Sequence, residues 1–238
     1  MKFFSFLALI VICASCRMFR DTEGYDIKSK HNDDNVVFTT NSKFIYSIDR
    51  IKGSDTLGNY IVNHLNDTLV VDRVMLTVLP GSFLGQTKVK WEYLNPNDSV
   101  VQKNITGIIE DSTTVWIHPP RSGMPLIFTE SAPFPKVKFP LVDNLSWPDG
   151  IGNLKGYEEI GLTGSVSFTY KNLGQAGVKT TNKNYKKSWK FFSEGQSCIG
   201  LSIHIFHFDE VDGFVYSEYD FPNGEKVILQ LEKRIEPM

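Results

Sequence analysis

The sequence has little cysteine and no excess of charge of either sign. Its 238 residues include 25 basic and 27 acidic side chains, which are mixed along the chain and leave a net charge of −2. Because no basic stripe occurs, nucleic acid is not an expected partner. The three cysteines, Cys13, Cys16 and Cys198, are too few for a disulfide framework.

Catalytic signatures are also lacking. No paired carboxylates, phosphate-binding loop or dinucleotide-binding glycine motif occurs in the chain. Residues 81–85 have the spacing Gly-Ser-x-x-Gly, whereas a serine nucleophile elbow has Gly-x-Ser-x-Gly. Cys198 follows no elbow motif either, and we interpret it as a partly buried free thiol. We therefore predict that the protein is not an enzyme and has no cofactor.

A metal site is not expected, although two histidines lie close together in sequence. His204 and His207 are three positions apart in a predicted strand, where side chains at that spacing point to opposite faces. His207 shares a face with Asp209, but two ligands do not complete a site. We interpret both histidines as ordinary strand residues.

The apolar stretch at the N-terminus is too short to cross a bilayer. Lys2 precedes the apolar residues 3–12, and Ala14 and Ser15 supply the small side chains that a signal peptidase needs. Cys16 follows directly. This ending resembles a bacterial lipobox, in which the cysteine is thioether-linked to diacylglycerol and becomes the first residue of the mature chain. The pattern usually has leucine where this chain has Cys13.

The lipobox resemblance implies a signal peptide over residues 1–15 and lipidation of Cys16. It also implies anchoring in a bacterial cell envelope, with the outer membrane as the expected location and either face open. The alternative is a secreted protein with a bridge between Cys16 and Cys198. Residues 16–35 are polar and charged, so we interpret them as a flexible tether.

Strand patterns dominate from residue 36 onward. Aromatic residues make up 13% of the chain, and Val89, Trp91 and Tyr93 alternate with polar residues as in a half-buried strand. Turn signals at residues 212–213 and 222–224 indicate hairpins near the C-terminus. We predict one all-β antiparallel domain over residues 36–238, built as an open half-barrel or as a β-sandwich.

Seven of the eleven prolines lie within residues 118–148. Proline has no backbone N–H to donate to a central ladder, so this segment is expected to run as an extended arm or as a sheet edge. Its apolar pieces, residues 125–128 and 137–141, are expected to pack the arm against the sheet. Gly150, Gly152 and Gly156 then indicate a loop.

Two residues at the start of this arm are candidate ligand-binding residues. His118 and Arg121 could form a polar anchor at the mouth of a cleft, where Arg121 would bind a carboxylate or phosphate. The structural alternative is that His118 caps a strand end and Arg121 pairs with an acid such as Glu110. Trp91 and Trp116 are candidate groove-lining aromatics, and such residues are more commonly core.

Several motifs together resemble a group of lipoproteins from Bacteroidota-type envelopes that carries no assigned activity. The motifs are the lipobox, residues 116–121, residues 133–135 and the ending around residues 213–224. The strand order is also similar to lipoprotein-carrier half-barrels, which shelter acyl chains in a curved sheet. The resemblance implies an envelope lipoprotein that shelters a lipid or another apolar ligand. The alternative is an accessory lipoprotein that docks onto an envelope protein complex.

Four Asp-Ser or Asp-Thr triplets resemble the O-glycosylation signal of Bacteroidota envelopes. Their candidate acceptors are Thr56, Thr68, Ser99 and Ser112. The alternative is that these pairs start strands after turns.

Overall fold

The computed structural model describes residues 35–237, and thirteen of the strands form one antiparallel sheet. These strands are β1 (Lys43–Lys52), β2 (Asp55–Leu57), β5 (Arg73–Phe83), β6 (Gln86–Leu94), β7 (Val100–Glu110), β8 (Thr114–Ile117), β9 (Lys136–Lys138), β10 (Ser146–Tyr157), β11 (Leu162–Lys179), β12 (Asn184–Ser197), β13 (Gly200–Asp209), β14 (Gly213–Asp220) and β15 (Glu225–Ile235). A second, two-stranded sheet pairs β3 (Tyr60–Val62) with β4 (Thr68–Val70). Two short 3₁₀ helices are η2 (Leu126–Ser131) and η3 (Glu158–Ile160).

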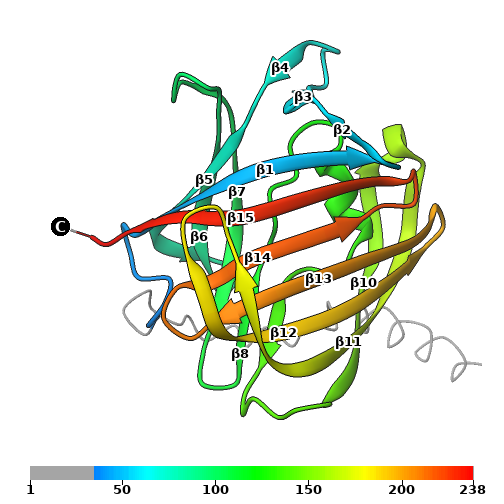
Figure 1. The fold of residues 1–238 in the computed structure, drawn as a ribbon. Helices are drawn as coiled ribbons and strands as arrows, with labels where there is room; N and C mark the ends of the chain where they lie inside the picture. The colour runs from blue at the N-terminus through cyan, green and yellow to red at the C-terminus, as the bar shows by residue number, and fades with distance from the viewer. Residues whose placement is uncertain (1–34, 238) are drawn as a thin grey trace, which may run out of the picture.

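The sheet curls into an open half-barrel, which confirms that prediction over the sandwich (Figure 1). Its strand order is β10-β11-β12-β13-β14-β15-β1-β5-β6-β7-β8-β9, with β2 paired to β1. The two edges, β9 and β10, are consecutive in the chain but are not hydrogen-bonded to each other. We call the line along which the β8–β9 edge faces β10 the seam.

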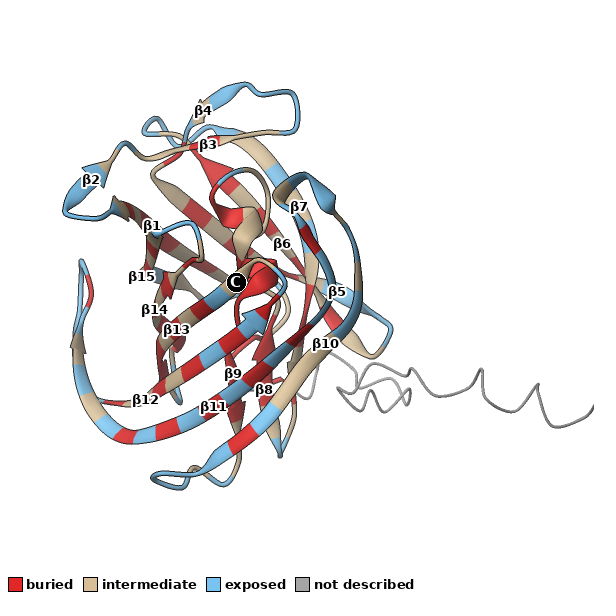
Figure 2. Ribbon diagram, turned by 90° about the vertical axis from the view of Figure 1, so that its right-hand side faces the viewer, coloured by how far each residue is buried: buried red, intermediate tan, exposed pale blue. Residues whose placement is uncertain are grey.

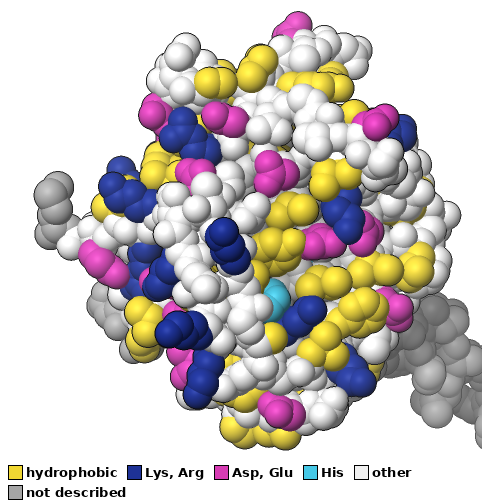
Figure 3. Space-filling model, in the orientation of Figure 1, with side chains coloured by type: hydrophobic (Ala, Val, Ile, Leu, Met, Phe, Trp, Pro, Cys, Tyr) yellow, Lys and Arg dark blue, Asp and Glu magenta, His cyan; other side chains and the backbone are white. Residues whose placement is uncertain are grey.

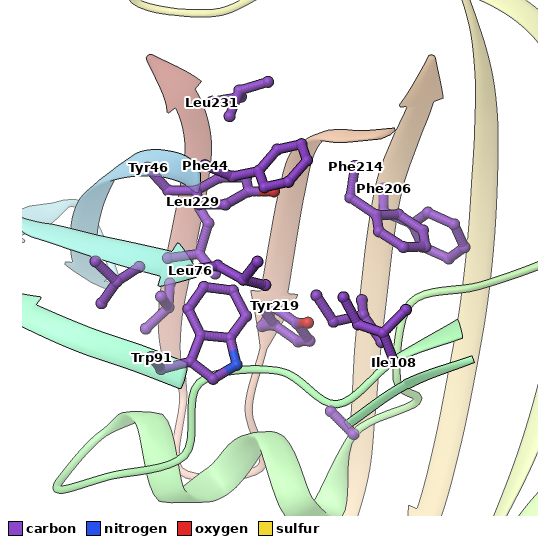
Figure 4. Close-up of a cluster of buried hydrophobic side chains, with 14 of the residues drawn as sticks. Phe44, Tyr46, Leu76, Trp91, Ile108, Phe206, Phe214, Tyr219, Leu229 and Leu231 are labelled. Atoms are coloured by element: carbon purple, nitrogen blue, oxygen red, sulfur yellow. The ribbon is translucent and has the colours of Figure 1, made fainter. Parts of the chain in front are cut away.

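Alternating burial explains how these sequences form curved strands. Along β1, Phe44, Tyr46 and Ile48 point inward and are buried, while the residues between them are only partly buried. Trp91 on β6 and Phe206 on β13 belong to the same inner cluster (Figure 4). Trp91, which the sequence offered as either groove lining or core, is therefore core.

The outer face of the sheet carries mixed side chains. Basic, acidic and hydrophobic groups intermingle over this face (Figure 3). On β14 and β15, Lys226 pairs with Glu218 and Asp220, whose carboxylates belong to the partly buried outer positions. This alternation of apolar inner and polar outer residues is typical of an antiparallel sheet with one solvated face.

Residues 118–135, which we call the plug segment, run through the concave side of the sheet. The η2 helix within this segment lies inside the curl (Figure 2). Hydrogen bonds join the plug segment to both halves of the sheet: Trp91 Nε1 to His118 O (3.1 Å), Ser122 N to Tyr93 Oη (2.8 Å), Tyr170 Oη to Phe134 O (2.9 Å) and His204 Nδ1 to Pro133 O (2.9 Å). The interior of the half-barrel is thus occupied by the protein's own chain.

The proline-rich region is therefore only partly the arm or edge that its composition predicts. Pro148 lies in β10, an edge strand, as the prediction requires. The plug segment, however, packs inside the sheet and includes buried residues such as Leu126, Ala132 and Phe134. Apolar residues between the prolines explain this location, because they are buried against the aromatic inner face.

The glycine-rich stretch after Pro148 is not a loop, contrary to the sequence-based expectation. It forms the second half of β10, whose pairing with β11 is interrupted by register shifts between Ile151 and Leu154 and between Leu154 and Tyr157. Asn153 and Gly156 have positive φ values of 55° and 88°, which bend the strand at those shifts. Among residues 35–237, no helix is long and apolar enough to cross a membrane.

Candidate binding cleft at the seam

A cleft of about 390 Å³ opens at the seam. One wall is formed by the bent part of β10, and the other comes from the end of β8 and from the plug segment. The lining residues are Gln86, Trp116, His118, Arg121, Glu130, Phe134 and residues 150–155 and 157. Because strands β8 and β10 do not pair here, side chains rather than a backbone ladder define the space between them.

An ion pair at the floor of the cleft fixes Arg121. Arg121 Nη1 lies 3.1 Å from Oε1 of Glu130, which belongs to η2 and is 2% exposed. Burial acts to lower the pKa of Arg121, but Glu130 and Tyr157 together outweigh this effect and the pKa is raised. Arg121 is thus a permanent cation whose position is fixed by the buried Glu130 carboxylate.

The sequence anticipated this pairing with an acid but named the wrong one. Glu110 instead accepts hydrogen bonds from the backbone N–H groups of Val36, Val37 and Phe38 at 2.8–3.0 Å. It is therefore committed to the first described residues of the chain. Arg121 and Glu130 are the only charged residues within the plug segment, and this was the signal that could have identified the pair.

His118 lies beside the same ion pair and is neutral. Its Nδ1 is 3.1 Å from the carbonyl oxygen of Pro119, which can only accept, so Nδ1 carries the hydrogen. Nε2 lies 3.3 Å from both Arg121 Nη1 and Glu130 Oε1. Burial is the main cause that lowers the pKa of His118; Glu130 opposes this effect and Arg121 adds to it. His118 therefore supports Arg121 instead of serving as a free ligand group.

Tyr157 reaches across the cleft from β10 to the same guanidinium. Its hydroxyl oxygen accepts a hydrogen bond from Arg121 Nη1 at 3.0 Å. Burial and the Glu130 carboxylate raise the pKa of Tyr157 to about 12. The phenol is thus neutral at physiological pH, and its bond to Arg121 closes one end of the cleft.

A second ion pair joins the two edges of the sheet at the seam, outside the cleft lining. Lys136 on β9 contacts Asp149 on β10, with Nζ and Oδ2 2.5 Å apart and both side chains nearly buried. Lys138 lies over the Trp147 ring at 5.4 Å from its centroid. The two sheet edges are therefore joined by side-chain contacts, with the cleft between them.

The two candidate tryptophans have different environments. Trp91 belongs to the core, and its indole N–H donates a hydrogen bond to the carbonyl oxygen of His118. Trp116 lines the cleft, is 3% exposed, and its Nε1–H has no hydrogen-bond partner among the described residues. The structure thus brings His118, Arg121 and Trp116 together and leaves Trp91 outside the cleft. Lys155 and Tyr157 were missed because the sequence indicated a loop there.

The remaining sequence-based candidates lie elsewhere. Thr56, Thr68, Ser99 and Ser112 are all exposed, so their glycosylation stays a prediction. Cys198 is a free thiol that is exposed, not partly buried, because β12 ends one residue before it. Cys16, the signal peptide and most of the tether lie outside the described residues.

The two strand histidines point to opposite faces, as expected. His204 is fully buried on the inner face and stacks on Tyr219 with ring centroids 4.0 Å apart. His207 pairs across the strands with Lys190 and lies 2.9 Å from the Ser188 hydroxyl. Within residues 35–237, no group of three His, Cys, Asp or Glu side chains is placed to hold a metal ion.

Comparisons with known proteins identify two solved structures with a similar arrangement. One is a protein described as exported, with a YmcC-like fold, from Bacteroides fragilis (8% identity, 84% of this chain and 98% of that chain, TM-score 0.41). The other is described as a lipoprotein, from Parabacteroides distasonis (9% identity, 87% and 99%, TM-score 0.45). No protein-family model matches the chain, and no curated protein matches it.

Proposed function

We propose that the protein is a lipid-anchored, non-catalytic component of a bacterial cell envelope that binds a small ligand in the seam cleft. One observation supports this binding site: the interior of the half-barrel is filled, whereas a cleft is open at the seam. The plug segment occupies the concave side of the sheet, whereas about 390 Å³ remains between β10 and the plug segment. This volume lies within the range of small-molecule sites.

The proposed anchor rests on the sequence alone. Cys16 follows an apolar segment and two small residues, which is the arrangement of a lipobox. Diacylglycerol on this cysteine carries two chains, and two chains suffice for stable membrane attachment.

The arrangement of titratable groups supports a binding role over a catalytic one. Glu130 is neutralised by Arg121, and both ring nitrogens of His118 face protein groups, with Nε2 turned toward the Arg121–Glu130 pair. Neither is available to take a proton from a substrate. The cleft therefore offers a fixed cation and apolar walls but no activated base or nucleophile among its described residues.

The filled interior also bears on the two functions suggested by the sequence. A lipid sheltered by the curved sheet would have to displace the plug segment, whose Phe134 and Pro133 carbonyls are bonded to the sheet. An accessory role through a docking arm is less favoured, because residues 118–135 of the proposed arm pack inside the sheet. The seam cleft is a place where a ligand can reach the protein without rearranging its core.

Lipid attachment can be tested by labelling cells with an alkyne fatty acid. The wild-type chain should incorporate the label, and Cys16→Ser should abolish it and release the protein from membranes. Equal labelling of the Cys16→Ser variant would overturn the anchor.

Ligand binding in the cleft can be tested with native mass spectrometry of the full chain. We expect a co-purified small molecule that is lost in Gly152→Trp, because Gly152 lines the cleft and a Cβ there meets no atom within 4 Å. Gly58→Trp is the matched control, since a Cβ at Gly58 makes only ordinary contact with Tyr60. Retention of the molecule in Gly152→Trp, or its absence from the wild type, would contradict binding in the cleft.

A further inference from the structure

The charge and shape of the cleft indicate which ligands it can take. We propose that it binds a small amphipathic oxyanion, with a carboxylate or phosphate group between Arg121 and Lys155 and an apolar body against the aromatic wall. This inference rests on the proposed binding function and adds the chemical class of the ligand.

Arg121 retains unused donors after its internal contacts. Its hydrogen bonds to Glu130 and Tyr157 and its contact with His118 all involve Nη1, and Nη2 and Nε have no partner among the described residues. The side chain is 35% exposed. A guanidinium with one edge fixed by protein and another edge open is arranged to bind an oxyanion through its free N–H groups.

Lys155 adds a second cation to the same cleft. It lies on the bent part of β10, is exposed, and makes no ion pair or hydrogen bond with any described residue. The only acidic side chain in the lining is Glu130, whose charge Arg121 already balances. The lining therefore carries one net positive charge that no protein group neutralises, because His118 is neutral.

Part of the lining is apolar, and it lies beside the polar side chains of Gln86 and Asn153. Trp116 and Phe134 form one wall, with ring centroids 5.8 Å apart, and Ile151 and Leu154 lie on the β10 side. The unpartnered Nε1–H of Trp116 is one further donor at the cleft wall. Cations together with apolar walls match a ligand with an anionic end and an apolar body. The volume of about 390 Å³ is near the lower end for ligand sites, which favours a small molecule.

The test compares three small aromatic probes that differ in their polar group: benzoate, phenyl phosphate and neutral benzyl alcohol. Binding to the full chain in lipid nanodiscs is measured from the tryptophan fluorescence, because Trp116 lines the cleft. We expect benzoate, phenyl phosphate or both to bind more tightly than benzyl alcohol. If one of the two anions binds more tightly, its polar group shows whether the cleft prefers a carboxylate or a phosphate.

A charge variant provides the second arm of the test. Lys155→Gln should weaken anion binding by about two- to five-fold, which is the range for one solvent-accessible charge pair, and should leave benzyl alcohol unaffected. Lys171→Gln, at an exposed position on β11 outside the lining, is the matched control and should change neither.

Equal affinity for all three probes, with no effect of Lys155→Gln, would overturn the anion preference while leaving a binding cleft intact. Failure of every probe to bind would overturn the inference as well. Loss of the co-purified molecule in Gly152→Trp tests the proposed function separately, so the two failures are distinguishable.

Discussion

The imidazole of His204 donates its Nδ1 hydrogen to the carbonyl oxygen of Pro133, 2.9 Å away. This contact joins β13 to the plug segment at a fully buried position, 0% exposed for His204. The ring is also stacked between Tyr219 and Phe206, at centroid distances of 4.0 Å and 4.9 Å. The bond fixes which tautomer is present and makes a neutral histidine part of the attachment of the plug segment.

Acid should therefore weaken the fold. Burial lowers the pKa of His204 from 6.5 to about 3 and that of His207 to about 4. The unfolded chain binds these protons first, so the free energy of unfolding should fall as the pH drops from about 6.5 toward 3. Urea unfolding at several pH values measures this slope, and His204→Phe should reduce it.

His204→Phe has its own expected cost at neutral pH. It keeps a stacked ring but loses the bond to Pro133, which is worth about 1 kcal/mol. An unchanged pH slope in this variant would show that His204 does not control the acid response.

Removing the cation from the Arg121–Glu130 pair should destabilise the protein. Arg121→Met leaves a carboxylate that is 2% exposed without its partner. Buried pairs broken in this way cost about 3–5 kcal/mol, and partial exposure of Arg121 reduces the expectation to roughly 2–3 kcal/mol. Urea unfolding measures the change, and adding Glu130→Gln to Arg121→Met should restore part of it.

The control is an ion pair of the same type at the surface. Arg73 pairs with Asp98 at 2.9 Å, but the Asp98 side chain is 69% exposed. Arg73→Met should cost less than about 1 kcal/mol. Equal costs for Arg121→Met and Arg73→Met would contradict the importance assigned to burial of Glu130.

The ion pair between Lys136 and Asp149 should control how firmly the seam is held. Lys136→Met leaves the nearly buried Asp149 carboxylate without its cation, with only the Gly150 N–H among the described residues still donating to it, and removes a link between the two sheet edges. We expect a loss of about 3–5 kcal/mol and faster amide hydrogen exchange in β10. Lys90→Met, which breaks a more exposed pair with Glu92, should leave exchange in β10 unchanged. Slow exchange in the Lys136→Met variant would mean that other contacts hold the seam.

The contact of the plug segment with β12 depends on a glycine. A Cβ on Gly195 would lie 2.9 Å from Cδ of Pro133 and 3.1 Å from the Ser131 carbonyl oxygen. Gly195→Ala should therefore destabilise the protein by about 1–3 kcal/mol, the cost of overpacking a core. Gly177→Ala on β11, where the nearest atom would be at 3.4 Å, is the control and should be tolerated. Thermal unfolding measures the melting temperature of each variant. Equal melting temperatures for the two variants would contradict the prediction.

The sequence predicts most of the sheet because the alternation of apolar and polar residues along a strand indicates directly which side chains are buried. Trp91 and Tyr93 alternate with charged residues, and they are buried as that pattern requires. Hairpin chemistry at residues 222–224 likewise leads to an antiparallel pair, β14 with β15. Half-barrel and sandwich share these local signals, so only the strand order of the folded sheet separates them.

The plug segment and the cleft could be predicted only in part. Proline content correctly excluded a central strand for residues 118–135, but it contains no information about which side of the sheet the segment occupies. Glu130 was missed as the partner of Arg121 because the short helix η2 brings the two residues together. The apolar residues around Glu130 did not predict that helix. Lys155 was missed because glycines near it indicated a loop, whereas bulged pairing makes it part of β10.

Strands β1 and β15 pair along their whole length, from Lys43 with Ile235 to Lys52 with Glu225. The first and last strands of the sheet therefore meet at its centre, where their long-range pairing joins the two halves into one sheet. Such non-local pairing makes folding slow and leaves strand edges open in the meantime. A chain that is threaded through a membrane from its N-terminus would keep β1 unpaired on one side until the segment 225–235 has crossed, so its folding would have to follow translocation.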